Sequence, residues 1–73
     1  MTDHRIDLIG LVPDELDRVL AAHFEARRKP AYRARQVRAW VYEKLATSFD
    51  EMHDLPQEER AALAEHFVLA APA

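Results

Sequence analysis

The side chains best suited to chemistry in this sequence are cations and aromatics concentrated in one stretch. Residues 27–44 hold seven basic residues and a single acid, together with Tyr32, Trp40 and Tyr42. The formal charge of this basic stretch is +6, against −9 for the other 55 residues, so the net charge of −3 conceals it. Concentrated positive charge is typical of surfaces that bind nucleic-acid phosphates, although a charged helix face that meets only water is commoner. Binding of RNA or DNA is therefore a hypothesis that charge alone does not decide.

The other reactive side chains form no catalytic constellation. The four histidines (His4, His23, His53 and His66) lack the four-residue spacing of a helical metal pair, and the HEXXH motif is absent. Ser48 is the only serine and is better explained as a helix cap. The chain has no cysteine, which excludes thiolate zinc sites and cysteine-ligated iron–sulfur clusters built from these residues. We expect no catalytic residue, no metal and no cofactor in this chain.

Length and composition indicate one small globular domain. The chain has 73 residues, of which 49% are hydrophobic and 32% charged, and it is too short to hold a cofactor domain of its own. The apolar run near the N-terminus is too short for a signal peptide or a membrane span. We therefore expect a soluble, cytoplasmic monomer with no membrane partner. Residues 1–12 are interpreted as an N-terminal arm, residues 13–69 as the helical domain and residues 70–73 as a tail or cut linker.

A first helix is predicted over residues 13–26. Pro13 and the two acids after it suit a first turn, and apolar residues then recur at three- and four-residue spacing. That apolar stripe consists of Leu16, Val19, Leu20 and Phe24. The three cations at residues 27–29 suit the negative end of the helix dipole, and Pro30 terminates the helix. These cations thus have a structural explanation beside the functional one.

A second helix with two different faces is predicted over residues 32–46. Its inward face is expected to consist of Val37, Trp40, Val41 and Leu45, which lie within about 140° of one another. Arg35, Arg38 and Tyr42 cluster on the other side within about 60°. We interpret Trp40 as a core residue and Tyr42 as the better candidate for stacking on a base.

Two capping boxes are predicted after the second helix. Ser48 with Glu51 matches one for a short turn, and Asp54 with Gln57 matches one that opens a third helix. Pro56 then lies in the first turn of that helix. Its acids, Glu58, Glu59 and Glu65, are expected to lie in water. The chain before residue 13 fits either an extended arm or a helical turn.

The predicted fold is all-α, a small bundle of three main helices with short connecting turns. The predicted core consists of Leu16, Leu20, Phe24, Val37, Trp40, Val41, Phe49, Leu63 and Phe67.

Three segments, in this order, resemble a known family. They are LxxLVPDEL at residues 8–16, KPAYRARQVRAWVYEK at residues 29–44 and SFDEMHDLPQEERAAL at residues 48–63. Over about residues 6–69 the chain closely resembles the N-terminal accessory domain of the RlmN/Cfr-type radical-SAM RNA methyltransferases. Within the second segment the family pattern is matched by Tyr32, Arg33, Ala34, Gln36, Val37, Trp40, Val41 and Tyr42. Within the third it is matched by Ser48, Phe49, Met52, Leu55, Pro56, Arg60 and Leu63.

The resemblance implies a small domain, similar to a helix-hairpin-helix module, that helps to present RNA to a separate catalytic barrel. The complete enzymes methylate carbon 2 of an adenine in ribosomal and certain transfer RNAs, with a 4Fe-4S cluster and S-adenosylmethionine. Because this chain has no cysteine, we expect it not to be an enzyme by itself. Many relatives carry glycine where this chain has Arg28, and its absence predicts a first helix longer by part of a turn.

Two functions remain open at this point. The leading hypothesis is an RNA-recognition accessory domain whose partners are ribosomal or transfer RNA and a radical-SAM catalytic domain. Its candidate RNA-binding residues are Arg27, Arg28, Lys29, Arg33, Arg35, Arg38 and Tyr42. The alternative is an interaction domain whose basic face docks onto a catalytic partner without contacting RNA.

Overall fold

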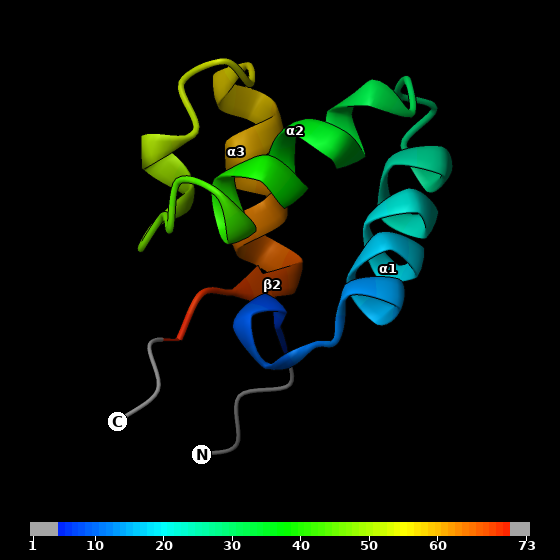
Figure 1. The fold of residues 1–73 in the computed structure, drawn as a ribbon. Helices are drawn as coiled ribbons and strands as arrows, with labels where there is room; N and C mark the ends of the chain where they lie inside the picture. Colours follow the sequence, from blue (N-terminus) through cyan, green and yellow to red (C-terminus); the bar gives the residue numbers. More distant parts are fainter. Residues whose placement is uncertain (1–4, 71–73) are drawn as a thin grey trace.

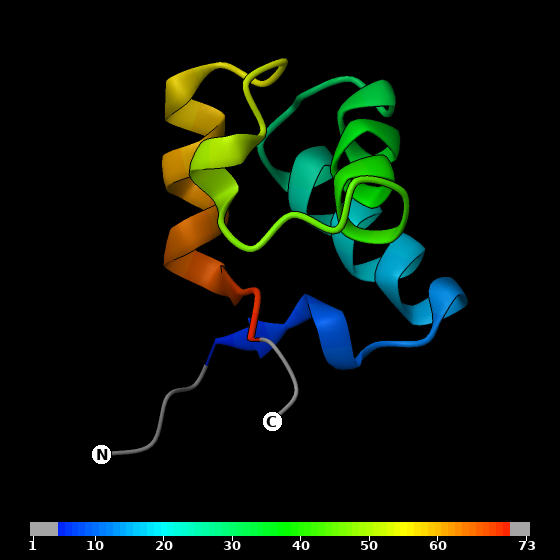
Figure 2. The ribbon, with the colours of Figure 1, turned by 60° about the vertical axis from the view of Figure 1, so that its left-hand side comes forward.

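The computed structural model describes residues 5–70 as three helices, two short 3-10 turns and one pair of very short strands (Figure 1). The helices are α1 (Pro13–Ala26), α2 (Tyr32–Tyr42) and α3 (Gln57–His66). The turns are η1 (Leu8–Gly10) and η2 (Phe49–Glu51), and the strands are β1 (Ile6–Asp7) and β2 (Phe67–Val68). In Figure 2, α1 and α2 lie together on one side of the molecule, and α3 and η2 lie on the other. The predicted class, all-α with three main helices, is confirmed.

The two ends of the described chain are joined through β1 and β2. These strands pair in parallel, with Ile6 opposite Phe67 and Asp7 opposite Val68. The Asp7 carboxylate accepts hydrogen bonds from the backbone N–H groups of Ile9 (3.0 Å) and Ala70 (3.2 Å). The arm is therefore extended first and helical after that, which brings the fully buried side chain of Leu8 into the core.

All nine predicted core residues are buried. They are joined in the core by Leu8, Ala46, Met52 and Leu55, from the arm and from the segment between α2 and α3. Among the described residues, no helix is long and apolar enough to cross a membrane.

Trp40 is a core residue with a polar anchor. Its side chain is 7% exposed, and its Nε1–H donates a 2.7 Å hydrogen bond to Oδ1 of Asp54. The predicted capping box of Asp54 and Gln57 is wrong, because α3 begins after Pro56 without a side-chain cap. The Asp54 carboxylate instead accepts a hydrogen bond from the indole. The capping box of Ser48 and Glu51 is confirmed.

The second helix ends at Tyr42, four residues earlier than predicted. Leu45 adopts a left-handed backbone conformation (φ 53°), and the N–H of Ala46 donates to the Trp40 carbonyl at 2.9 Å. This turn buries Ala46 and leaves the Leu45 side chain 73% exposed. The prediction that Leu45 belongs to the inward face is therefore wrong, because the helical geometry on which it depended stops before that residue.

The first helix ends at Ala26, so the predicted extension past this residue is also wrong. Arg28 itself takes the left-handed conformation, with φ 59°. Its N–H donates to the Glu25 carbonyl at 3.0 Å, and the N–H of Lys29 donates to the Phe24 carbonyl at 2.8 Å. These two bonds form a Schellman motif, which satisfies the last carbonyls of the helix without a glycine.

Replacement of Trp40 by alanine tests its place in the core. Trp40→Ala should lower the free energy of unfolding by about 3–5 kcal/mol, because a buried aromatic side chain is lost and a cavity remains. Urea denaturation followed by circular dichroism measures this change. The control Val12→Ala removes an exposed aliphatic side chain and should change stability by less than about 0.5 kcal/mol. Equal stability of the two variants would contradict the core assignment.

Substitution of Arg28 by glycine tests the conformation of the α1 cap. Arg28→Gly should raise the free energy of unfolding by about 0.5–1 kcal/mol, because glycine reaches a positive φ without the steric cost that a side chain adds. In the matched control, Ala21→Gly in the exposed middle of α1, stability should fall by about 1 kcal/mol. A loss of stability in both variants would show that Arg28 is not held in a left-handed conformation.

Candidate nucleic-acid interface

Arg27 is turned inward to a buried carboxylate. Its Nε and Nη2 donate to the two oxygens of Glu59 at 3.0 and 2.9 Å. Glu59 is only 1% exposed, and Nζ of Lys29 lies 3.6 Å from the same carboxylate. The hydrogen bonds from Arg27 hold the pKa of the Glu59 carboxyl below its ordinary value, against the opposing effect of burial. Two of the seven candidate residues thus connect the α1–α2 junction to α3.

The prediction that Glu59 lies in water is wrong. Glu59 precedes Ala62 and Leu63 at three- and four-residue spacing, and both of these residues are buried. A helical wheel therefore places the carboxylate on the inward face of α3. An acid on an apolar helix face requires a cationic partner, and this signal could have directed attention to Arg27.

Arg33 lies against the segment that precedes α3. Its Nη1 donates to Oε1 of Gln36 at 3.0 Å and to the carbonyl of Asp54 at 3.3 Å. Its guanidinium also lies 4.9 Å from the centre of the Tyr32 ring. Arg33 thus secures α2 against the loop before α3, and its side chain is only partly open to solvent.

The face of Arg35, Arg38 and Tyr42 is divided among three surroundings. Arg38 lies 3.4 Å from the Asp17 carboxylate of α1, and both side chains are 48% exposed, so this surface ion pair contributes little to stability. The Tyr42 hydroxyl donates to the carbonyl of Leu11 at 3.0 Å, which turns the ring toward the N-terminal arm. Arg35 is exposed on α2.

Two arginines of the basic stretch are exposed and unengaged. Within residues 5–70, the side chains of Arg28 and Arg35 have no hydrogen-bond or ion-pair partner, whereas those of the other five candidates each have at least one. Arg28 precedes the N-terminus of α2, and Arg35 lies at the end of its first turn. The side chains of Arg28 and Arg35 are therefore open to an external anion, whereas the other five candidates make contacts within the domain.

Histidines from two helices meet in a cleft of about 600 Å³ between α1 and the end of α3. The ring centres of His23 and His66 are 5.7 Å apart, and His23 also makes an edge contact with Phe67. The Nε2 atom of His23 is buried and has no hydrogen-bond partner. Among the described residues, no group of three or more potential ligands could hold a metal ion. The histidine pair therefore belongs to the packing between α1 and the end of α3.

Comparison with known sequences gives the family. A family model described as the ribosomal RNA large subunit methyltransferase N-terminal domain matches residues 6–69. The chain belongs to this family. The dual-specificity RNA methyltransferase RlmN of Geobacter sulfurreducens is 48% identical over 63 residues, which are 86% of this chain and 16% of that protein. The protein of the same name from Gluconobacter oxydans is 39% identical over 72 residues, 99% of this chain and 17% of that protein.

The chain spans 16–17% of the length of these two relatives. A probable dual-specificity RNA methyltransferase RlmN of Rhodopirellula baltica is 51% identical over 45 residues, 62% of this chain and 12% of that protein. The family drawn from the sequence motifs is confirmed, and the 73 residues do not include the catalytic part of the methyltransferases. Without a cysteine, they also offer no ligand set for the iron–sulfur cluster that the resemblance implies for the complete enzymes.

The environment of His23 leads to a pH-dependent stability. Burial is the main cause that lowers the pKa of His23 from 6.5, followed by the nearby His66 and Arg27, while Glu59 acts in the opposite direction. The unfolded chain therefore takes up a proton at this site before the folded chain does. Stability should be highest above pH 6.5 and should decrease as the pH falls through 6.5 toward the lowered pKa of the folded state.

The variant His23→Phe isolates the contribution of His23 to the pH dependence of stability. His23→Phe keeps an aromatic ring against Phe24 and Phe67 and removes the titration. Between pH 7 and about pH 5, the free energy of unfolding should fall more steeply in the wild type than in His23→Phe. Urea denaturation at several pH values measures both slopes. Parallel curves would show that His23 titrates alike in the folded and unfolded chains.

Proposed function

We propose that this chain is an RNA-recognition module of an RlmN-type methyltransferase and that Arg28 and Arg35 make its main phosphate contacts. The proposal is carried by one observation: these two exposed arginines have no partner within the described residues, although thirteen acids are present in the chain. Elsewhere in the basic stretch, acids or carbonyl oxygens engage Arg27, Lys29, Arg33 and Arg38. The Nζ of Lys44 lies 4.1 Å from the centre of the Trp40 ring. Membership in a family of RNA methyltransferases makes RNA the expected source of the missing anion.

The position of these arginines on α2 supports an anion ligand. The N-terminus of a helix carries partial positive charge, so cations there are unfavourable unless an anion is bound. The first turn of α2 has no acidic residue and its N-cap residue, Ala31, provides no side-chain cap. Arg33 and Arg35 lie in this turn, and Arg28 lies just before it. A phosphate of RNA would be attracted by the helix end and the guanidinium groups together.

Arg38 is a secondary contact in this proposal. Its exposed ion pair with Asp17 is weak enough to open when a phosphate approaches. Arg27 and Lys29 hold the buried Glu59, and their release would leave an uncompensated carboxylate inside the domain. With two to three phosphate contacts, binding should be weak, of the order of 10⁻⁴ to 10⁻⁶ M at physiological salt.

Neutralisation of single arginines tests the assignment. Arg28→Gln and Arg35→Gln should each weaken the binding of a transfer RNA and of a hairpin from large-subunit ribosomal RNA. Each should also reduce the slope of log affinity against log salt concentration by about one, because one phosphate contact is lost. Fluorescence anisotropy at two or more salt concentrations measures both effects.

Arg18→Gln is the matched control for these variants. Arg18 is an exposed arginine of α1 outside the basic stretch, so its neutralisation removes the same charge at another place. The RNA affinity of Arg18→Gln should stay close to that of the wild type. Equal losses in all three variants would indicate a response to net charge only, and an affinity that is independent of salt would exclude phosphate contacts by this face.

A further inference from the structure

We propose that an apolar groove at the C-terminal end of α2 docks the domain onto the catalytic part of the methyltransferase. The groove has a volume of about 310 Å³ and is here called the Leu45 groove. The residues that line it are Ile9, Val41, Tyr42, Leu45, Ala46, Thr47 and Leu69. The inference depends on the family of the chain and on this surface, and it does not depend on RNA binding by the arginines.

Leu45 has both an unfavourable backbone conformation and an exposed apolar side chain. A bulky side chain at a positive φ is a steric outlier, because Cβ crowds the neighbouring backbone in this conformation. Its side chain is also 73% exposed, the largest exposed fraction among the large hydrophobic residues of the described chain. Neither the strain nor the exposed apolar surface stabilises the isolated domain. Burial of the leucine against a partner would offset both costs.

Hydrogen bonds on both sides of Leu45 hold the side chain in its outward position. The N–H of Lys44 donates to the Ala39 carbonyl at 3.1 Å, and that of Ala46 donates to the Trp40 carbonyl at 2.9 Å. The hydroxyl of Tyr42, which also lines the groove, donates to the Leu11 carbonyl at 3.0 Å. The groove is thus formed before any partner arrives, which lowers the entropic cost of docking.

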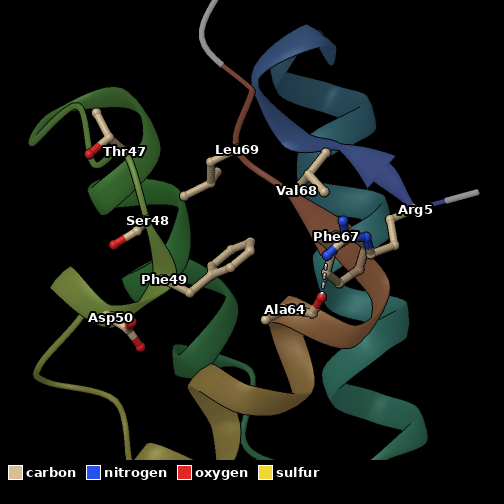
Figure 3. A pocket seen from close by; sticks show the side chains of 9 residues that line it. All are labelled: Arg5, Thr47, Ser48, Phe49, Asp50, Ala64, Phe67, Val68 and Leu69. Carbon is tan, nitrogen blue, oxygen red and sulfur yellow. Dashed lines mark hydrogen bonds between the residues drawn. The ribbon is translucent and has the colours of Figure 1, made fainter. Parts of the chain in front are cut away.

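A second, more polar cleft of about 270 Å³ adjoins the groove (Figure 3). Thr47 and Leu69 line both hollows. In Figure 3 the Leu69 side chain extends from the segment after β2 toward the segment that carries Thr47. In Figure 3, Arg5 lies on the far side of this cleft, where its Nη1 donates to the Ala64 carbonyl at 3.0 Å, and Asp50 lies on the near side, next to Phe49. An apolar centre beside a polar border is the usual arrangement of a protein–protein interface.

The chemistry of the groove favours protein over RNA as its occupant. No cationic side chain lines it, and its walls are aliphatic apart from Tyr42 and the hydroxyl of Thr47. Arg28 and Arg35 lie toward the other end of α2, beside its N-terminus. RNA phosphates would therefore find no counter-charge within the groove.

The position of the groove indicates the catalytic part of the methyltransferase as its partner. The chain matches the N-terminal domain of proteins about five to six times its length. Leu69, which lines the groove, lies next to Ala70 at the C-terminal end of the described residues. In a methyltransferase of this family, the catalytic part follows the N-terminal domain, and Leu69 near the end of that domain lines the Leu45 groove. A surface of the catalytic part can reach the groove without a long linker, at a high effective concentration.

Amide hydrogen exchange in a chimera tests the docking. This chain is joined to the catalytic part of the Geobacter sulfurreducens relative, in place of the N-terminal region to which it is 48% identical. Amides of residues 42–47 should exchange at least about tenfold more slowly in the chimera than in the 73-residue chain, because docking adds to the cost of local opening. Leu45→Asn should remove this protection, since asparagine is similar in size and tolerates a positive φ but is polar.

Val12→Thr is the matched control, because it replaces an exposed aliphatic side chain outside the groove with a polar one of similar shape. Its chimera should keep the protection of the wild type. Circular dichroism of the 73-residue variants checks the fold, and Leu45→Gly replaces Leu45→Asn if the latter is unfolded. Equal exchange in the wild-type chimera and the isolated chain would overturn the proposal, as would full protection in the Leu45 variant.

RNA binding by the 73-residue chain separates this proposal from the previous one. Leu45→Asn should leave RNA affinity unchanged, while Arg35→Gln should lower it. If Leu45→Asn weakened RNA binding as much as Arg35→Gln does, the groove would be an RNA surface and the docking proposal would be wrong. Loss of the arginine effect alone would overturn the RNA assignment and leave the docking result intact.

Discussion

The buried carboxylate of Glu59 is the constraint on which the arrangement of this domain depends. A charge at 1% exposure is tolerated only with a close cationic partner, and the bidentate hydrogen bonds from Arg27, with Lys29 nearby, supply it. Because Arg27 and Lys29 flank the left-handed Arg28, this pairing also determines which cation at the junction faces outward. The contribution of the pair to stability should be present above the ordinary pKa of a glutamate and be lost as the pH falls through the lowered pKa of Glu59.

Helix α2 is bounded on both sides by residues with left-handed backbone conformations that are not glycine. Arg28 precedes it and Leu45 follows it, and these are the positive-φ residues of the described chain. At each position the side chain is directed into solvent while the neighbouring residue contacts the interior: Lys29 reaches Glu59, and Ala46 enters the core. The same left-handed backbone conformation thus exposes a cation before α2 and an aliphatic side chain after it. The middle of the helix, with Val37, Trp40 and Val41, supplies the packing that keeps the two ends in place.

Apolar periodicity predicts the presence of the three helices and nine residues of the core, because burial of an apolar stripe is a local pattern with a fixed spacing. The bounds of α1 and the burial of Trp40 followed from it. The errors have a different origin. The end of α2 depends on one unfavourable φ at Leu45, which is maintained by tertiary packing around Ala46 and has no sequence signal such as glycine. The parallel pairing of Ile6 with Phe67 joins residues at opposite ends of the chain, which periodicity does not detect.

The candidate site could be predicted only as a set of charges. Sequence spacing places Arg35 and Arg38 on one helix face, but it does not tell which of them meets Asp17 of α1. Nor does it show that Tyr42 is bonded to the N-terminal arm. Both contacts arise from the packing of other elements against α2. When the cations with partners inside the domain are set aside, the basic stretch offers only a few exposed guanidinium groups, which lie beside the N-terminus of α2. Since long-range attraction to a polyanion follows the local density of uncompensated charge, the proposed RNA contact of this acidic protein is favoured at this end, where, among the described residues, the Arg28 and Arg35 side chains form no ion pair with an acid.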